Sequence, residues 1–543
     1  MKKLLLWLLL LTMLGACVRH TEKHGLPFER VVLNSDYFCP ELNTWIRFTD
    51  TSGAVSGFFY SDSGRAEAMV LPFAVRWNGD HWTCWYKNDS LRSWLFEVSA
   101  ESDTSFTVMA YNKEYRFSME KEPSFPMHTE RYRRNITDSV TMVTVNFGMA
   151  KGYYTSKKVN EISEEKYLDI IYDVSKTLAR NILMEDLPLE MDIYQPYGDS
   201  CSKRPLLLLI HGGAFMLGDK SSPTMKTMAR YFAGKGYVVA SVNYRMGFWI
   251  VPGAYYFLER AIYRATQDVR ASLRYLSAHA EEYGIDTSRI YTCGNSAGGF
   301  LALNAAMMND DNYFPSHKGD VYYLLDDLGC LDCSTNRLKD RFHVKAVVNM
   351  WGALTHIRML TGRPDVPLLC FHGSGDRIIP PGHDYPFLNI SRELSAFFTE
   401  KVFGSEIIYK YSRVTRTPVT LKMFAGRGHD PHINDDGTFN AVFDTIQQMT
   451  CSFLYPFHAA PAVSVKGKFK LNRNDDSPVY TCSVPDGQTE VFWKARGGKV
   501  VRDKYDQGTI RVIWFKGMKH ELYTALRNRN HSVSFKSYPV TVR

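Results

Sequence analysis

The residues best suited to chemistry lie in one pentapeptide, 294–298, which is the only G-x-S-x-G in this chain of 543 residues and has Ser296 at its centre. Residues 289–292 before it have a strand-like pattern, and the small apolar residues of 300–306 suit a helix. A serine on a tight turn between a strand and a helix presents its hydroxyl, and this context lets the motif supply a nucleophile. Ser296 is therefore the predicted nucleophile, and a glycine-rich turn without chemistry is the alternative.

An acid and a base follow later in the chain. Asp376 comes after the apolar run 366–371 and a short glycine-rich turn, and His429 comes after the run 419–424 and a similar turn. Taken singly, either side chain is also consistent with a loop that has no catalytic role. Together they follow Ser296 in the order serine, acid, histidine, each at the end of a different predicted strand, which is the order of an α/β-hydrolase triad.

Other histidines and carboxylates near in sequence are alternatives to this pair. His383 and His432 are rivals of His429, but only His429 directly follows a Gly-x-Gly turn after the last predicted strand. Three other carboxylates near in sequence fit the role of the acid less well. Asp365 precedes its strand, Asp384 lies well past the turn, and Asp430 is next to the histidine.

A further glycine-rich loop starts directly after the apolar run 206–210, with His211, Gly212, Gly213 and Ala214. Adjacent glycines allow backbone N–H groups to point into one space. Acyl transfer requires such fixed donors, because its tetrahedral intermediate carries an oxyanion. A plain strand-to-helix loop is the alternative interpretation.

The elements that must position these residues alternate between strands and helices. Continuous apolar runs, typical of strands buried on both faces, alternate with stretches of helical period such as 259–283. This alternation predicts a mostly parallel sheet with helices on both faces. Expected strands are 166–174, 189–195, 206–210, 237–242, 289–292, 344–351, 366–371 and 419–424, the first two antiparallel, with further helices at 225–233 and 388–398.

With this motif set, residues 166–455 resemble the α/β-hydrolase superfamily, in particular bacterial serine esterases and carboxylesterases with an HGG-type oxyanion loop. The resemblance implies Ser296 as nucleophile, His429 as general base and Asp376 as its orienting acid, with no cofactor and no metal. It also implies an oxyanion hole made by the N–H groups of Gly212, Gly213 or Ala214 together with that of Ala297. Asp268 matches an acidic residue that is common in a helix of this family, and the resemblance implies a structural role for it.

The predicted function is hydrolysis of a carboxylic ester, carried by a small molecule or a glycan, through an acyl-enzyme intermediate. Two alternatives stay open: a serine peptidase of the same fold, and a non-catalytic binding protein that uses the fold as a scaffold. Two insertions, 247–257 and 307–342, are candidates for a lid over the site, because connections of this length are usually functional or disordered.

The first 17 residues predict export rather than fold. Lys2 and Lys3 precede an apolar run at 4–14, and Cys17 ends a segment that resembles the lipobox of bacterial lipoproteins. Lipidated Cys17 would anchor the protein to a bacterial membrane, and Val18 after it favours the outer membrane. A plain secretory signal is the alternative.

Two β-rich domains are expected to flank a catalytic domain at 160–457. Short strands with Gly, Asp, Ser and Asn turns predict an N-terminal all-β sandwich or barrel at 33–147. Residues 462–543 predict a C-terminal β-sandwich and resemble an immunoglobulin-like domain of the polycystic-kidney-disease type. From 461 onward the chain has 16 Lys and Arg against 7 Asp and Glu, a net +9. This charge suggests an anionic polymer or membrane surface as partner, and a merely solvated basic face is the alternative. Nucleic acid is not expected.

The cysteines give no disulfide framework, because nine remain beyond Cys17 and they are scattered. Cys330 and Cys333 have the spacing of a metal or redox pair, but neither a second such pair nor a nearby pair of histidines accompanies them. A local disulfide or two free thiols is the expectation.

Overall fold

The computed structural model describes the ranges 36–41, 44–51, 54–61, 67–68, 70–77, 82–86, 94–102, 105–110, 113–119, 125–126, 130–152, 185–248, 256–309, 327–502 and 506–543. The predicted leader with Cys17, the strand expected at 166–174 and the central parts of both insertions lie outside these residues. Within the described ranges, no helix combines the length and the apolar character needed to cross a membrane.

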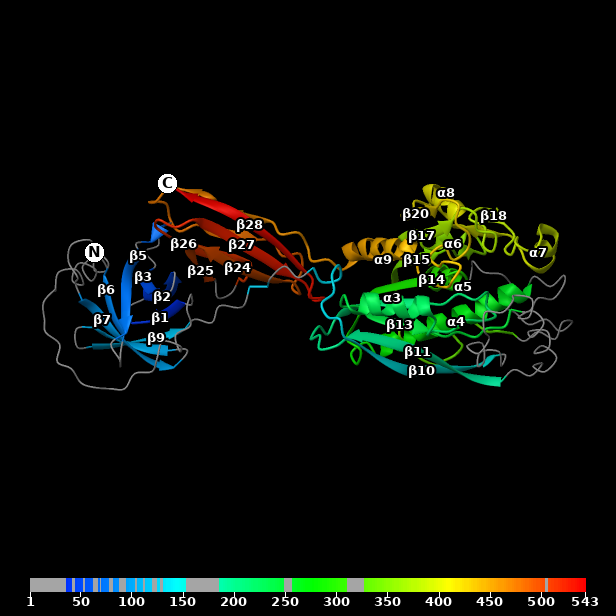
Figure 1. Cartoon of the computed structure of the whole chain (residues 1–543), viewed down its shortest axis with the longest axis horizontal. Coiled ribbons are helices and arrows are strands. Elements are labelled where there is room, and N and C mark those ends of the chain that lie inside the picture. The colour runs from blue at the N-terminus through cyan, green and yellow to red at the C-terminus, as the bar shows by residue number, and fades with distance from the viewer. Residues whose placement is uncertain are drawn as a thin grey trace. The chain divides into compact units, whose positions relative to one another are not determined.

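The chain divides into two units, and the unit that contains the predicted catalytic domain, named the catalytic unit for that reason, comprises residues 129–460 and 528–533. Its centre is an eight-stranded sheet in the order β10-β11-β13-β12-β14-β15-β17-β20 (Figure 1). Pairing is antiparallel from β10 to β13 and parallel from β13 to β20. The strands are β10 (Val140–Gly152), β11 (Glu185–Pro196), β12 (Arg204–Ile210), β13 (Val238–Val242), β14 (Ile285–Asn295), β15 (Val344–Met350), β17 (Leu368–Gly373) and β20 (Val419–Phe424).

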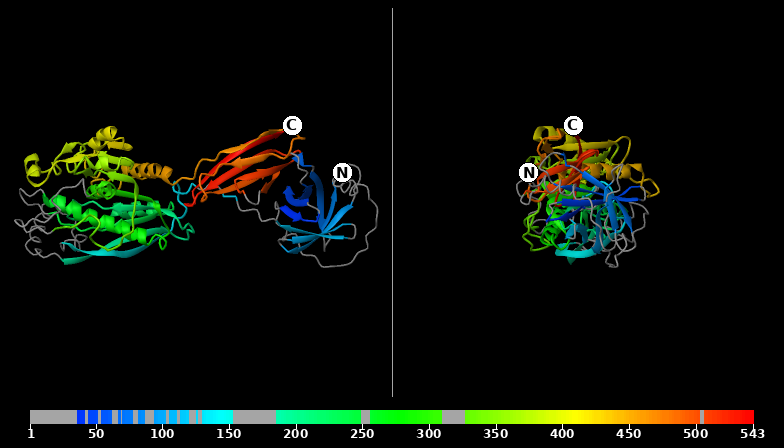
Figure 2. Two further views of the ribbon diagram at one scale, coloured as in Figure 1. Left: turned by 180° about the vertical axis from the view of Figure 1, so that it is seen from behind. Right: turned by 90° about the vertical axis from the view of Figure 1, so that its left-hand side faces the viewer.

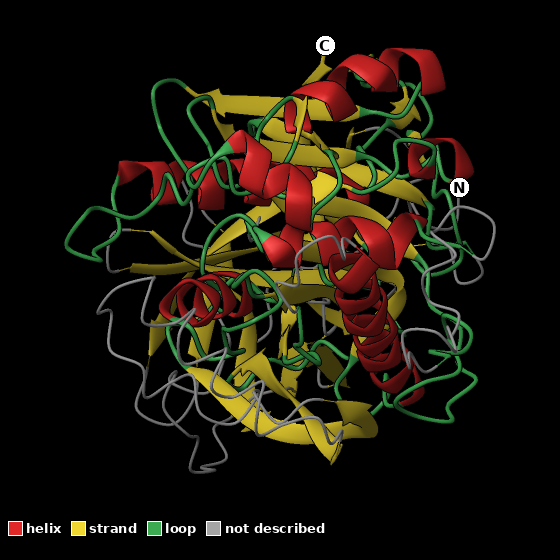
Figure 3. Cartoon of the chain, turned by 90° about the vertical axis from the view of Figure 1, so that its right-hand side faces the viewer, coloured by secondary structure: helices red, strands yellow, loops and turns green. Residues whose placement is uncertain are grey.

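Helices cover both faces of this sheet (Figure 1), and Figure 3 views the helices and loops of the same unit from the side. They are α3 (Pro223–Ala233), α4 (Tyr256–Ala278), α5 (Ala297–Met307), α6 (Met359–Gly362), α7 (Arg392–Phe398), α8 (Ser405–Thr415), α9 (Ala441–Leu454) and the 3₁₀ turn η5 (Tyr455–Phe457). A smaller sheet in the order β16-β19-β18 is formed by β16 (Ala353–Leu354), β19 (Val402–Gly404) and β18 (His383–Asp384).

The apolar run of β12 explains its central place, because all seven of its residues are buried. Side chains alternate across a strand, so Leu206 and Leu208 pack into a core with residues of α4 and α5. Leu207 and Leu209 pack into a second core with residues of α3 and α9. The sheet therefore separates two cores, as the run of apolar residues predicts.

The first strand of this sheet corrects a predicted boundary. Residues 140–147 were expected in the N-terminal domain 33–147, but they belong to β10, which pairs along its whole length with β11. The strand at 189–195 is present within β11, and its partners are β10 and β13. A two-residue alternation identifies a strand but does not say which sheet it joins, because partners are set by contacts distant in sequence.

A second correction concerns the C-terminal domain expected at 462–543, because 528–533 groups with the catalytic unit. The Arg529 guanidinium donates to both carboxylate oxygens of Asp286 at 2.9 and 3.0 Å. Asn530 Nδ2 donates to the same carboxylate at 2.9 Å. The segment contributes few apolar side chains, so its polar attachment leaves no periodic signal in the sequence.

The other unit, residues 1–128, 461–527 and 534–543, begins with a closed antiparallel barrel in the order β1-β2-β3-β5-β6-β7-β8-β9 (blue in Figure 2). Tyr37, Phe48, Phe73, Phe106 and Phe117 fill its interior. Its strands are β1 (Asp36–Cys39), β2 (Thr44–Thr51), β3 (Ala54–Ser61), β5 (Val70–Trp77), β6 (Trp82–Tyr86), β7 (Trp94–Ser102), β8 (Ser105–Ala110) and β9 (Lys113–Met119).

Two further sheets in this unit enclose a core around Trp493 and Trp514 (orange and red in Figure 2). One has the order β21-β23-β26-β25 with β4 (Glu67–Ala68) paired to β26, and the other has the order β22-β28-β27-β24. The strands are β21 (Val465–Gly467), β22 (Lys470–Leu471), β23 (Val479–Cys482), β24 (Glu490–Arg496), β25 (Gly498–Arg502), β26 (Thr509–Phe515), β27 (His520–Arg527) and β28 (Val533–Val542). The resemblance to the polycystic-kidney-disease type stays a prediction.

One buried ion pair in the catalytic unit joins α4 to the segment after β13. The Asp268 carboxylate is fully buried and accepts from the Arg245 backbone N–H at 2.8 Å and from Arg245 Nε at 2.9 Å. Thr335 Oγ1 donates to the same carboxylate at 2.5 Å. Asp268 thus joins α4 to two other segments, in agreement with the structural role that the resemblance implies.

Asp268→Ala is expected to lower the free energy of unfolding of the catalytic unit by about 3–5 kcal/mol, because it leaves a buried guanidinium without its counter-charge. Glu406→Ala is the control, since Glu406 pairs with Lys410 on an exposed helix face and such pairs contribute about 0–1 kcal/mol. Urea denaturation followed by circular dichroism measures both changes. Equal effects of the two substitutions would contradict the structural role of Asp268.

Candidate active site

Ser296 lies in the sharp turn between β14 and α5, with φ 52° and ψ −120°. A positive φ is uncommon for any residue but glycine, and here it directs the chain back over the sheet. The flanking glycines make the turn possible. A Cβ on Gly294 would lie 2.1 Å from the Gly298 carbonyl oxygen, and a Cβ on Gly298 would lie 2.0 Å from the Ile210 carbonyl oxygen.

Three predicted residues meet beside this turn. His429 Nε2 lies 2.9 Å from Ser296 Oγ, and His429 Nδ1 lies 2.8 Å from Asp376 Oδ2. Asp376 is in the loop after β17 and His429 is in the loop after β20. The three side chains form one hydrogen-bonded chain, which is the arrangement that activates a serine hydroxyl.

The Asp376 carboxylate is fixed on both oxygens. The backbone N–H groups of Ile378 and Ile379 donate to Oδ1 at 2.9 Å each. His372 Nε2 lies 3.4 Å from Oδ2. Burial alone would raise the pKa of Asp376, but the hydrogen bonds and charges of His372 and His429 lower it to about 2. The carboxylate is therefore ionised at neutral pH.

The pKa of His429 is shifted in the opposite direction to that of Asp376. Burial alone would lower its pKa, but the hydrogen bond with Asp376 and the negative charges of Asp430 and Asp376 raise the pKa above its usual value. Asp430 has φ 51° and directly follows the histidine. The pair Asp376–His429 therefore favours an imidazolium, the form that a general base takes when it has accepted a proton.

The rival residues lie elsewhere. His432 is buried, its Nε2 is 2.9 Å from Thr224 Oγ1, and burial lowers its pKa to about 4. His383 lies on β18, away from the chain of hydrogen bonds. Of the competing carboxylates, Asp365 pairs with Arg363 and Asp384 pairs with Arg392.

The glycine-rich loop after β12 lies against the serine. A Cβ on Gly212 would be 3.2 Å from Ser296 Cβ, and Gly213 and Ala214 have φ values of 118° and 52°. Among the described residues, no backbone carbonyl accepts from the N–H of Gly213 or Ala214. Ala297 is the first residue of α5, and the first N–H groups of a helix lack partners within it. Ala214 and Ala297 line the same cavity as Ser296, so the predicted oxyanion donors include residues beside the serine.

Polar contacts hold this loop in place. Asp219 accepts from the Ser221 N–H at 2.7 Å and from Asn243 Nδ2 at 3.1 Å, and the Lys220 N–H donates to Asn243 Oδ1 at 2.6 Å. The His211 ring stacks on Tyr244 with centroids 4.4 Å apart. Asp219 and Asn243 were not recognised in the sequence. Asn243 follows a strand directly, and that position was the available signal.

A narrow apolar cavity of about 20 Å³ opens beside the serine. Phe387 forms part of its wall, and its ring stacks on Phe248 with centroids 6.2 Å apart. The lining residues are Ala214, Phe215, Leu258, Ile262, Ser296, Ala297, Phe300, Ile378, Ile379, Pro386 and Phe387. Most of this wall leaves no signal in the sequence, because its residues come from five segments that carry no shared motif.

In the described part of the chain, no three or more His, Cys, Asp or Glu side chains lie close enough together to hold a metal ion. Cys330 and Cys333 form a disulfide, which decides between the two states expected for them. The bond closes a short loop in the second insertion, and Asp332 between them pairs with Arg270 and Arg274 of α4.

Several known proteins to which this chain is similar are esterases. Residues 191–366 match the BD-FAE family model. Acetyl esterases of Salmonella schwarzengrund and Salmonella typhi are 26% identical over 254 residues, which is 43% of this chain and 70% of theirs. Solved structures of Thermogutta terrifontis esterase 2, including its propionate-bound form, align with 50% of this chain and 90% of theirs at 20% identity and a TM-score of 0.33. The sheet topology and the family match together support an α/β-hydrolase fold and an ester hydrolase.

Proposed function

We propose that the catalytic unit hydrolyses carboxylic esters through an acyl-enzyme on Ser296, with His429 as general base and Asp376 as the carboxylate that orients it. The observation that carries this proposal is the hydrogen-bonded chain Asp376–His429–Ser296, with distances of 2.8 and 2.9 Å. The similarity to acetyl esterases supports the same reaction.

In the first half-reaction, His429 Nε2 accepts the proton of Ser296 as Oγ attacks the ester carbonyl carbon. The N–H groups around Gly213, Ala214 and Ala297 donate to the oxyanion that forms. His429 then gives its proton to the leaving alkoxide, which departs as the alcohol. In the second half, water loses a proton to His429 and attacks the acyl-enzyme; the carboxylic acid leaves and Ser296 regains its proton. No step uses a cofactor.

The apolar cavity suits the acyl side of the ester. A cavity must offer about 10–15 Å³ to hold one water molecule, so about 20 Å³ accepts a group the size of a methyl. This small volume favours a short acyl group such as acetyl over a long chain or an aromatic ring. We therefore propose an acetyl ester as the preferred substrate.

Ser296→Ala is expected to lower kcat for p-nitrophenyl acetate by about a millionfold, as loss of the nucleophile does in other triads, with an unchanged melting temperature. Ser202→Ala is the control, because Ser202 is exposed in the turn between β11 and β12. Turnover by the Ser296 variant close to that of the wild type would refute the assignment.

Aminoacyl p-nitroanilides in the same assay test the peptidase alternative, and inactivity towards both substrate classes would favour a binding protein.

Phe387→Ala is expected to enlarge the acyl cavity and to shift the preference from p-nitrophenyl acetate towards the butyrate and hexanoate, because the side chain forms one of its walls. The ratio of kcat/KM values for butyrate and acetate should rise about tenfold, as an added pocket for one or two methylenes permits. Phe397→Ala is the matched control, since Phe397 is 54% exposed on α7. An equal ratio in the two variants would show that the cavity does not hold the acyl group.

The pH dependence follows from the raised pKa of His429. The neutral imidazole is the base, so kcat/KM should fall as the pH is lowered through a value above the usual 6.5. Asp430→Asn removes one negative charge that raises this pKa, so the acid limb should move to lower pH. Asp435→Asn removes an exposed carboxylate in the same loop and should leave the limb in place. A limb that moves equally in both variants, or to higher pH in Asp430→Asn, would contradict the account.

A further inference from the structure

A second histidine contacts the acid of the proposed triad. His372 lies in β17, is fully buried, and precedes Asp376 by four residues. Its Nε2 lies 3.4 Å from Asp376 Oδ2 and 2.8 Å from the Ile379 carbonyl oxygen. Oδ2 is also the oxygen that His429 Nδ1 approaches to 2.8 Å. Two imidazoles therefore contact one carboxylate oxygen, and the proposed mechanism uses only that of His429.

The partners of His372 determine which of its ring nitrogens carries the proton. Nε2 faces the Ile379 carbonyl and the ionised carboxylate of Asp376, and both groups can only accept, so Nε2 must carry a hydrogen. The other ring nitrogen, Nδ1, lies 2.7 Å from Ser405 Oγ. The Ser405 hydroxyl receives a hydrogen bond from Asn349 Nδ2 at 3.2 Å, so it can donate its own proton to Nδ1. These contacts suit a neutral imidazole with its proton on Nε2.

Asn349 is held in one orientation by the backbone, and this orientation fixes the rest of the chain of hydrogen bonds. The Gly352 N–H donates to Asn349 Oδ1 at 3.0 Å, so the Nδ2 end of the amide faces Ser405. Asn349 is in β15 and Ser405 is the first residue of α8, and both are fully buried. The hydrogen bonds therefore continue from His372 into two buried elements of the catalytic unit.

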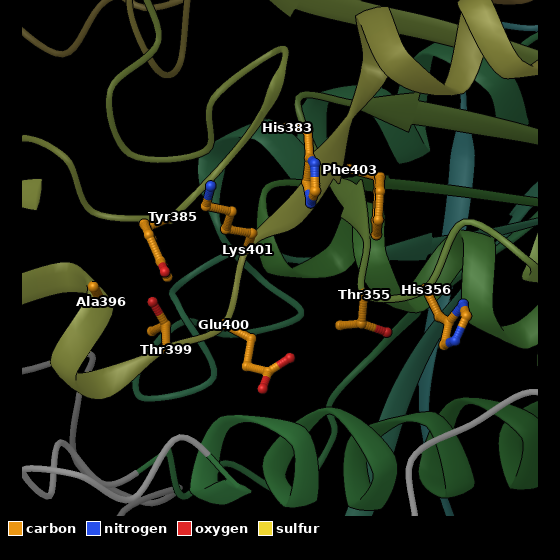
Figure 4. A pocket seen from close by; sticks show the side chains of 9 residues that line it. All are labelled: Thr355, His356, His383, Tyr385, Ala396, Thr399, Glu400, Lys401 and Phe403. Carbon is orange, nitrogen blue, oxygen red and sulfur yellow. The ribbon is translucent and has the colours of Figure 1, made fainter.

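The small sheet fixes the position of Ser405. Its strand β19 ends directly before Ser405 and pairs with both β16 and β18. Phe403 of β19 and His383 of β18 line a cavity of about 560 Å³, and Figure 4 shows their rings side by side. The two rings stack with their centroids 4.2 Å apart and their planes at 10°. Ser405 therefore follows a paired strand and not an unpaired loop.

His372 also holds the turn that holds the acid. The Ile379 N–H donates to Asp376 Oδ1 at 2.9 Å, while the Ile379 carbonyl accepts from His372 Nε2. Ile379 lines the apolar cavity beside Ser296 as well. His372 thus acts on the Asp376 carboxylate in two ways, by direct contact with Oδ2 and through the turn at 376–379.

We propose that His372 is a positioning residue of the triad, which holds the Asp376 carboxylate in the orientation that His429 requires. A buried carboxylate keeps one orientation when fixed donors surround its oxygens, because a lone pair left without a donor costs free energy. Ser405 and Asn349 keep the N–H of His372 directed towards the acid. Without this N–H the carboxylate can turn about its bond to Cβ, and His429 Nδ1 loses a fixed acceptor. This inference rests on the proposed ester hydrolysis.

The test compares two substitutions that differ in one hydrogen-bond donor. His372→Phe keeps a flat ring but removes the N–H, whereas His372→Gln places an amide N–H near the position of Nε2. His372→Phe should lower kcat for p-nitrophenyl acetate about tenfold to a hundredfold, as displacement of a catalytic group does. KM should stay nearly unchanged, because the lost interaction concerns the transition state. His372→Gln should recover most of the loss in kcat.

His458→Phe is the matched control for the loss of a buried histidine. His458 is 1% exposed, and its ring nitrogens lie 3.1 and 3.2 Å from the hydroxyls of Tyr237 and Tyr291. Its partners are these tyrosines and not residues of the triad. The substitution should therefore lower the melting temperature and leave kcat unchanged.

Ser405→Ala is a second variant that leaves the His372 ring in place. Removal of the hydroxyl frees Nδ1 to take the proton, so kcat should fall in the same direction with KM unchanged. Combined with His372→Phe, it should add little to the loss in kcat, because both substitutions act through one ring.

The outcomes separate this inference from the proposed function. Wild-type hydrolysis of p-nitrophenyl acetate that is lost in Ser296→Ala upholds the proposed function whatever the His372 variants show, and an inactive wild type overturns both. Equal values of kcat in His372→Phe and His372→Gln, or an equal loss in His458→Phe, would show that the N–H of His372 does not position the acid. If His372→Phe does not fold, Ser405→Ala decides, and an unchanged kcat in that variant overturns the inference.

Discussion

The catalytic geometry depends on the parallel alignment of β12, β14, β17 and β20, because parallel strands end at one edge of a sheet. Pairing sets the ends level: Ile210 lies opposite Gly294, and Gly373 lies opposite Phe424. The loops that leave these four positions carry the proposed oxyanion donors and the side chains of Ser296, Asp376 and His429. Residues as distant in sequence as Ser296 and His429 therefore meet at hydrogen-bonding distance. Each side chain then needs only a short loop to reach its partner.

The sequence predicted this edge well because every signal there is local. A continuous apolar run indicates a strand buried on both faces, and the residues directly after it must lie at the edge of the sheet. Ser296, Asp376 and His429 each follow such a run or its turn, and the structure brings all three together. Gly294 also has a local cause, since a Cβ there would meet the Gly298 carbonyl of the following helix, whereas Gly298 is required by the close approach of β12 at Ile210.

Other parts of the structure left no local signal. Residues 140–147 of β10 were expected in another domain, because alternation identifies a strand but not its partner. The strands β16, β18 and β19 have two or three residues each, which is too short for any periodic pattern. Both cavities are therefore invisible in the sequence. Their walls combine side chains from segments that only the tertiary fold brings together, such as Phe215, Leu258 and Phe387.

The loop after Asp376 has several tasks at once. Its N–H groups at Ile378 and Ile379 fix the carboxylate, and the same two residues line the apolar cavity beside Ser296. His383 and Tyr385, further along the loop, line a second cavity on the small sheet. Substitutions here are expected to change orientation of the base and choice of substrate together.

The most direct test of the account is to locate a covalent bond at the nucleophile. Diisopropyl fluorophosphate reacts with an activated serine: Oγ attacks phosphorus, fluoride leaves, and the serine proton is taken up by the histidine. Mass spectrometry of the digested protein should find one diisopropylphosphoryl group per chain, on the peptide that contains Ser296, with esterase activity lost in proportion. Full inactivation with the group on another residue, or an unmodified Ser296 in an inactivated enzyme, would contradict the central claim.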